Sequence, residues 1–148
     1  IDDQFVLLIL GEGEKKGEIK KLIKKRGIED KVFLLGFKKN IYSYMHKSSA
    51  FVLSSLWEEV GFVIVEAALC NSFVISSNCP NGPKEFLDNG KRGILFESNQ
   101  SKALLNSLKN FSKMDKNEIF KNKVKLKKEA KKYTIFKHYI ELNKILKL

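Results

Sequence analysis

Two carboxylates, Glu58 and Glu66, stand eight positions apart in the segment 54–69, which reads SSLWEEVGFVIVEAAL. Gly61 lies between them and opens a run with helical periodicity that ends near Leu69. A helix rises about 1.5 Å per residue, so Glu66 lies at most about 12 Å beyond Glu58, and both carboxylates can face one ligand. The N–H groups and the positive dipole end of a helix N-terminus bind anions, phosphates above all. The segment therefore suits a diphosphate between two polyols, with one carboxylate for each sugar.

The same residues carry a resemblance to a known family. Glu58 and Glu66, with Gly61 inside the interval, resemble the E-x7-E motif of retaining GT-B glycosyltransferases of the family 4 type. Further along, the segment 78–85 reads NCPNGPKE. It resembles the C-P-x-G-P-[KR]-E loop of bacterial members that use UDP-hexose or UDP-N-acetylhexosamine. The resemblance therefore implies a UDP-linked sugar donor.

Gly36 and Phe37 follow an apolar run and resemble the family's G-F loop beside the nucleotide base. The resemblance runs from about Phe5 to the end and covers only the nucleotide-sugar half of such an enzyme. The acceptor domain, and an Arg and a Lys that grip the diphosphate, would lie before Ile1. We therefore expect residues 1–148 to form a single donor-binding domain, a fragment of a longer two-domain enzyme that has no turnover alone.

The resemblance also implies a role for each motif residue. Glu66 would hold the ribose hydroxyls, and Glu58, the catalytic candidate, would contact hydroxyls of the transferred sugar. A carboxylate can accept hydrogen bonds from two neighbouring hydroxyls. Gly61 would let the backbone approach the diphosphate, where Phe62 and Val63 offer N–H groups. The side chains from Phe62 to Val65 are expected in the core.

Several neighbouring residues leave alternatives open. Spacing favours Glu58 over Glu59, since Glu59 leaves only six residues before Glu66. Lys38, after the G-F loop, is either a substrate contact or a solvated side chain, and the same choice holds for Lys84. Trp57 is either a sugar platform or part of the core, and we favour the core.

No metal or other cofactor is expected. Cys70 and Cys79 form no C-x-x-C pair, and His46 and His138 are far from them in sequence, so a zinc site is disfavoured. In the resembling family the helix dipole and basic side chains neutralise the leaving diphosphate without a metal. Two carboxylates could also suggest a glycosidase, but there they flank one bond from separate elements.

The net charge is +11, and 26 of the 28 basic residues are lysine. Residues 113–148 carry twelve lysines against four acids. A solvated lysine-rich surface explains this excess, and attraction to an anionic membrane surface is the second interpretation. Nucleic acid is disfavoured as a partner, because lysine lacks the bidentate chemistry of arginine and no RNA- or DNA-binding motif occurs.

Short apolar runs alternate with helical patterns along the first two thirds of the chain, which has 148 residues and 43% apolar content. The pattern predicts a doubly wound, Rossmann-like α/β parallel sheet, the C-terminal half of a GT-B fold, with extra C-terminal helices. Buried strands are expected at 5–10, 32–35, 50–53, 73–76 and 93–96, and C-terminal helices at about 102–110, 116–131 and 135–147. An apolar stripe on these helices should pack on the sheet: Ile119, Phe120, Val124 and Tyr133.

The first hypothesis is thus the donor-binding half of a metal-independent hexosyltransferase in bacterial polysaccharide biosynthesis, with a glycan or lipid-linked acceptor. The alternatives are a non-catalytic nucleotide-binding α/β module and a basic nucleic-acid binder. No apolar run approaches the length of a membrane-spanning helix, and no signal peptide is visible. We expect a cytoplasmic protein, with peripheral contact to the inner face of the membrane as a further expectation.

Overall fold

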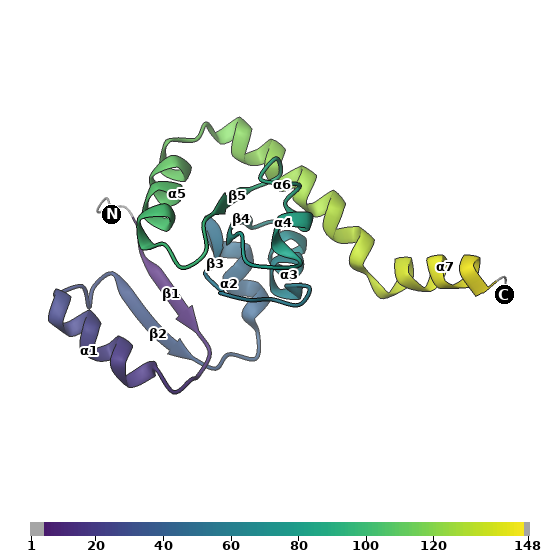
Figure 1. Cartoon of the computed structure of the whole chain (residues 1–148). Coiled ribbons are helices and arrows are strands. Elements are labelled where there is room, and N and C mark those ends of the chain that lie inside the picture. The colour runs from purple at the N-terminus through teal and green to yellow at the C-terminus, as the bar shows by residue number, and fades with distance from the viewer. Residues whose placement is uncertain (1–4, 147–148) are drawn as a thin grey trace. The chain divides into compact units, whose positions relative to one another are not determined.

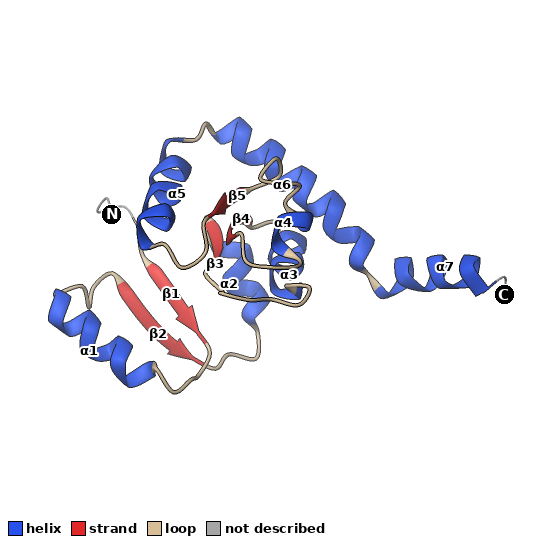
Figure 2. Cartoon of the chain, in the orientation of Figure 1, coloured by secondary structure: helices blue, strands red, loops and turns tan. Residues whose placement is uncertain are grey.

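The computed structural model describes residues 5–146. Its backbone contacts divide the chain into two compact units, the first reaching to Ile41 and the second beginning at Tyr42. Both units are built from parallel strands joined by helices (Figures 1 and 2). This is the α/β, Rossmann-like class that the sequence predicts.

The first unit is a single strand–helix–strand motif. Strand β1 (Leu7–Leu10) runs into helix α1 (Lys16–Arg26), and strand β2 (Val32–Gly36) returns parallel to β1. Helix α1 ends at Gly27, whose φ of 61° is the left-handed conformation that glycine adopts without steric cost.

The prediction of a fully buried first strand is wrong. Leu7 and Leu8 are 49% and 43% exposed. In the described part of the chain β1 pairs with β2 alone, so it is an edge strand. An edge strand with few elements packed over it leaves part of its apolar surface in water.

The second unit holds a three-stranded parallel sheet in the order β3-β4-β5. Helix α2 (Ile41–Lys47) leads into β3 (Ala50–Leu53), α3 (Phe62–Leu69) joins β3 to β4 (Phe73–Ser77), and α4 (Pro83–Phe86) precedes β5 (Ile94–Phe96). All five residues of β4 are buried, since β4 has a parallel neighbour on each side. Within residues 5–146 the strands thus form one two-stranded and one three-stranded sheet.

Three C-terminal helices follow: α5 (Ser101–Lys113), α6 (Lys116–Ala130) and, after the short 3-10 turn Lys131–Tyr133, α7 (Ile135–Leu146). Helix α5 contacts the sheet through Phe111, whose ring centroid lies 5.0 Å from that of Phe73. Helix α6 contacts α3 and β4, and it buries Leu126 and Ala130 completely. Lys147, the expected end of α7, lies outside the described residues.

The predicted packing of the C-terminal helices is only partly right. Phe120 and Val124, expected on the sheet, are 64% and 51% exposed, because α6 turns its Leu126 and Ala130 face inward instead. Helix α7 buries none of its residues and points away from the sheet of its own unit (Figure 1). Tyr133 does reach the core, where its ring meets Phe86 edge to face at 5.7 Å.

Candidate functional site

The carboxyl ends of β3, β4 and β5 meet at one edge of the second unit's sheet, because the three strands are parallel. Three loops leave this edge, residues 54–61, 78–82 and 97–100. Open α/β sheets bind ligands beyond the carboxyl ends of their strands. The E-x7-E segment and the segment 78–85 thus share the edge where a ligand is expected.

Helix α3 begins at the end of the loop 54–61, which leaves this edge from β3. Gly61 precedes it with φ 71°, a left-handed conformation that lets the loop turn sharply into the helix. The carbonyl of Gly61 accepts a hydrogen bond from the Ile64 N–H at 2.9 Å. The N–H groups of Phe62 and Val63 have no acceptor within residues 5–146, so both are available to a ligand. Their predicted contact with a diphosphate stays a prediction.

The side chains of this helix divide between core and surface. Ile64 and Val65 are buried at 0% and 3% exposure, as expected. Phe62 is 58% exposed, so its predicted place in the core is wrong. The reason is its place on the helix: Phe62 is the first residue of α3, and the buried face is formed by Ile64, Val65, Ala67 and Ala68.

Glu58 is half-buried and held in place. Its Oε1 accepts a hydrogen bond from the Ser55 hydroxyl at 2.6 Å, and its backbone carbonyl accepts one from Asn81 Nδ2 at 3.3 Å. Glu59 is exposed, and its side chain has no hydrogen bond or ion pair within the described residues. The ordered carboxylate of the pair is therefore Glu58, the one that spacing favours.

Glu66 is the fifth residue of α3, about 6 Å along the axis from the start of the helix. Its side chain is half-buried, and Oε1 lies 3.4 Å from the Tyr42 hydroxyl of α2, which donates to it. Oε2 has no partner in the described part of the chain. Glu58, Glu66 and the N–H groups at the start of α3 thus belong to one loop-and-helix segment. Each of these groups can still form a hydrogen bond to a ligand.

The remaining predicted residues, Gly36, Phe37 and Lys38, belong to the first unit. Gly36 ends β2 with φ 67°, and Phe37 is 72% exposed. The Glu12 carboxylate lies over this loop, since a Cβ at Gly36 would stand 2.7 Å from Glu12 Oε1. A hydrogen bond from Lys16 is the main cause that lowers the pKa of Glu12.

Sequence reasoning missed four residues that shape these loops: Glu12, Tyr42, Ser55 and Asn81. Only Ser55 carried a usable signal, its three-residue spacing to Glu58, which is short enough for a local side-chain bond. Trp57, favoured as a core residue, is 65% exposed, because it stands on the loop rather than on β3 or α3.

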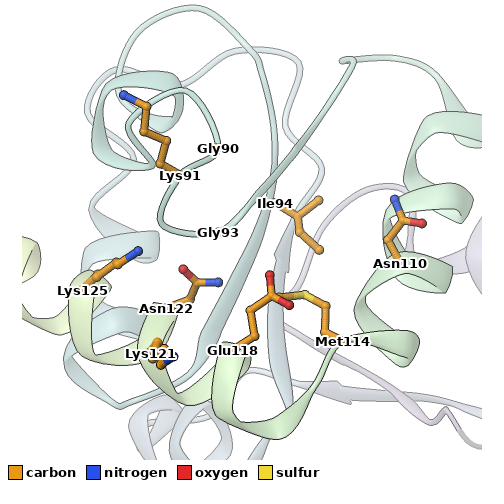
Figure 3. A pocket seen from close by; sticks show the side chains of 10 residues that line it. All are labelled: Gly90, Lys91, Gly93, Ile94, Asn110, Met114, Glu118, Lys121, Asn122 and Lys125. Atoms are coloured by element: carbon orange, nitrogen blue, oxygen red, sulfur yellow. The ribbon is translucent and has the colours of Figure 1, made fainter.

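A pocket of about 510 Å³ lies elsewhere in the second unit, around Ile94 at the start of β5. Figure 3 shows Met114, Glu118 and Asn122 of the α5–α6 region reaching toward the space beside Ile94. Ile94 marks the amino end of its strand, the opposite edge from the E-x7-E segment. None of the predicted site residues lines this pocket.

Two further properties bear on the class of site. Residues 5–146 contain no group of three or more His, Cys, Asp or Glu side chains placed to hold a metal ion. In the same range, none of the helices combines the length and apolar character needed to cross a bilayer.

The chain is a parallel α/β domain with the E-x7-E segment at the carboxyl edge of its second sheet, and comparison with known proteins identifies its family. Residues 1–136 match the family described as "Glycosyl transferases group 1". The chain therefore belongs to the group 1 glycosyltransferases, and its fold is that of a GT-B glycosyltransferase domain.

Relatives occur among bacterial and archaeal enzymes. The chain is 35% identical over 125 residues, 84% of its length and 34% of the relative's, to the N-acetylgalactosamine-N,N'-diacetylbacillosaminyl-diphospho-undecaprenol 4-alpha-N-acetylgalactosaminyltransferase of Campylobacter jejuni. It is 43% identical over 81 residues, 55% of the chain and 20% of the relative, to an uncharacterized glycosyltransferase of Methanocaldococcus jannaschii. The chain thus spans about a third or less of the length of these relatives.

A solved structure agrees in fold. The structure of HepE from Anabaena in complex with UDP superposes with a TM-score of 0.86 at 23% identity, covering 98% of this chain and 41% of HepE. At this identity the superposition shows the shared fold.

Proposed function

We propose that this chain is the donor-binding domain of a retaining glycosyltransferase, which moves a hexose or N-acetylhexosamine from a UDP-sugar. The observation that carries the proposal is the E-x7-E segment. It brings the ordered Glu58, the free N–H groups of Phe62 and Val63, and Glu66 onto one loop-and-helix segment at the ligand-binding edge of a parallel sheet.

Each group has a role that its chemistry suits. Glu66, one turn into α3, accepts the ribose hydroxyls, and the start of α3 takes the diphosphate. Glu58 contacts hydroxyls of the sugar that is transferred. Gly61 keeps the approach to the diphosphate free of a side chain. Gly36, Phe37 and Lys38 serve the nucleotide base.

The leaving group of the transfer is the diphosphate. The donor's anomeric carbon loses its bond to the diphosphate oxygen, which leaves as UDP, and gains a bond to the oxygen of an acceptor hydroxyl with the same configuration. The hydroxyl's proton passes to the leaving diphosphate oxygen. Two N–H groups and the dipole of α3 stabilise the charge that develops on the leaving oxygens. This arrangement supports a metal-independent transfer.

The acceptor is proposed to be a glycan or a lipid-linked oligosaccharide of bacterial polysaccharide biosynthesis. Support comes from the C. jejuni relative, whose name specifies a diphospho-undecaprenol acceptor. Because the chain spans 34% of that relative, residues 1–148 are proposed as one donor domain of a longer enzyme, inactive alone. The location that fits a lipid-linked acceptor is the cytoplasm, with peripheral contact to the inner face of the membrane.

Titration calorimetry with UDP tests the proposal. The chain should bind UDP equally well in EDTA and in Mg²⁺. Glu66→Ala should weaken binding by about 1.5–3 kcal/mol, the value of hydrogen bonds to a charged group. Glu59→Ala is the matched control and should bind as the wild type does, since Glu59 is exposed and unpaired in the described structure.

Equal UDP binding by the wild type and by Glu66→Ala would remove Glu66 from the site. Failure of the wild-type chain to bind UDP at all would contradict the donor-binding function itself. Sugar transfer by the longer enzyme, and its loss in Glu58→Gln, separates a transferase from a non-catalytic nucleotide-binding module.

A further inference from the structure

Glu58 lies in a loop, yet hydrogen bonds from two other residues of the second unit hold both its side chain and its backbone. The loop 54–61 has no regular secondary structure, yet the Glu58 carboxylate accepts the Ser55 hydroxyl at 2.6 Å. This contact occupies Oε1 and leaves Oε2 without a partner in the described part of the chain. A carboxylate held this way presents one oxygen to a ligand in a fixed direction.

Ser55 is itself anchored to the sheet. Its backbone carbonyl accepts the Ser77 hydroxyl at 2.6 Å and the Ser98 hydroxyl at 3.4 Å. Ser77 ends β4 and is completely buried, while Ser98 follows β5. Ser55 is therefore tied to the end of β4 and to the loop after β5, at the edge where the ligand is expected. These contacts restrain the loop that carries Glu58.

The segment 78–82 supports the same loop from the other side. Asn81 Nδ2 donates to the Glu58 carbonyl at 3.3 Å. Gly82 packs so closely on the Val60 carbonyl that a Cβ at Gly82 would overlap it. Asn78 fixes the base of this segment, since its Oδ1 accepts the Ser98 N–H at 2.9 Å.

From these contacts we infer that Ser55 and Asn81 are positioning residues for Glu58, which hold its carboxylate ready for the transferred sugar. The inference rests on the proposed function, because it takes Glu58 as the sugar contact. It adds two residues outside the E-x7-E motif that determine how well the sugar part of the donor is recognised. Pre-ordering a long side chain removes an entropic cost that a ligand would otherwise meet on binding.

The test measures binding of UDP, UDP-glucose and UDP-N-acetylgalactosamine to the chain by calorimetry. The readout is the ratio between the affinity for the better of the two UDP-sugars and the affinity for UDP alone. This ratio isolates the sugar contact from the nucleotide contact. A loss of folding would instead lower all three affinities together, and a thermal melt of each variant checks for it.

Ser55→Ala should lower the ratio about three- to ten-fold, the scale expected for ordering one flexible side chain, and leave the UDP affinity unchanged. Ser55→Thr keeps a hydroxyl and should restore the ratio. Glu58→Gln should bring the ratio close to one. Ser112→Ala is the matched control, since the Ser112 hydroxyl donates only to the Lys109 carbonyl within α5 and should leave the ratio unchanged.

Asn81→Gly is the second variant. Asn81 has φ 68°, so glycine keeps the backbone conformation while it deletes the side-chain donor. It should lower the ratio in the same direction as Ser55→Ala, with unchanged UDP affinity.

The outcomes separate the inference from the function it rests on. If Ser55→Ala and Asn81→Gly keep the wild-type affinity ratio while Glu58→Gln lowers it to about one, the positioning role is overturned. The proposed donor site would then stand unchanged. A ratio of one in the wild type overturns it as well, because Glu58 then holds no sugar. Absence of UDP binding contradicts the proposed function.

Discussion

The Tyr42 hydroxyl lies 3.4 Å from Glu66 Oε1 and joins α2 to α3 at the carboxylate proposed to hold the ribose. The contact is long for a hydrogen bond between oxygens, and Tyr42 is 50% exposed. It orients Glu66 without burying it, and Oε2 stays free for a ligand. A small effect on affinity follows from such a contact.

Tyr42→Phe should weaken UDP binding by about two- to three-fold, because a hydrogen bond as long as 3.4 Å at a half-exposed site contributes only at the low end of about 0.5–1.5 kcal/mol. Calorimetry measures the affinity. Tyr139→Phe is the control, since Tyr139 is 60% exposed on α7 and should have no effect. A loss for Tyr42→Phe as large as that for Glu66→Ala would show that the tyrosine itself contacts the nucleotide.

Gly61→Ala should destabilise the second unit by about 1–2 kcal/mol, the cost of a left-handed conformation for an L-residue. The surroundings allow the methyl group, since the nearest atom to a Cβ there is 3.7 Å away, so conformation alone sets the cost. Urea unfolding measures it. Gly13→Ala, where no atom lies within 4 Å and φ is not positive, should be close to neutral. Equal stability of the two variants would contradict the strain argument.

Gly82→Ala should be more damaging than Gly61→Ala, because its Cβ would overlap the backbone carbonyl of Val60 and force the two loops apart. A loss of about 3 kcal/mol or more is expected from such overpacking. Urea unfolding again gives the value, with Gly17→Ala as a control in open space on α1. A nearly neutral Gly82→Ala would mean that the loops separate freely, which would also weaken the case for their support of Glu58.

The stability of the second unit should fall at alkaline pH partly through Tyr133. Burial is the main cause that raises the pKa of Tyr133 above its usual value near 10. Below that value the hydroxyl is protonated in both states and contributes no pH dependence. Between the unfolded and the folded pKa only the unfolded chain loses the proton, so stability falls as pH rises through that range.

Unfolding free energies from pH 8 to 11 should therefore decline less steeply for Tyr133→Phe than for the wild type. The comparison cancels the titration of the many lysines, which both proteins share. Tyr139→Phe, at an exposed site, should follow the wild type. Parallel pH profiles for wild type and Tyr133→Phe would show that the hydroxyl ionises equally well in the folded state.

The chain should sediment with anionic vesicles at low salt and leave them near physiological ionic strength, where charge attraction extends only about 8 Å. The attraction would come from the twelve lysines of residues 113–148. The double variant Lys121→Ser, Lys125→Ser should therefore lower the bound fraction at low salt several-fold. Phe136→Ser, Ile145→Ser, at two exposed apolar positions of α7, should leave it unchanged. Salt-resistant binding to neutral vesicles would indicate apolar insertion instead, and absence of binding to either kind would leave the lysines as a solvated surface.

The sequence by itself determined the class of fold and the segment of the candidate site that contains Glu58, Gly61 and Glu66. An apolar run as short as 73–76, rich in β-branched and aromatic residues, favours a buried strand over a helix, and a glycine at position 61 before a helical run indicates where α3 begins. Spacing also selected Glu58 over Glu59. These features depend on neighbours within about ten residues, and a linear pattern records such neighbours.

Tertiary structure alone decided which surfaces are covered and what holds Glu58. Trp57, Phe62 and Phe120 look like core residues by type, yet they stand on a loop or on outward helix faces. The anchors of Ser55 come from Ser77 and Ser98, which are 22 and 43 residues away. A serine hydroxyl can donate to any carbonyl that the fold brings near, so no local sequence pattern predicts these contacts. The parallel pairing of β3, β4 and β5 brings the three serines together.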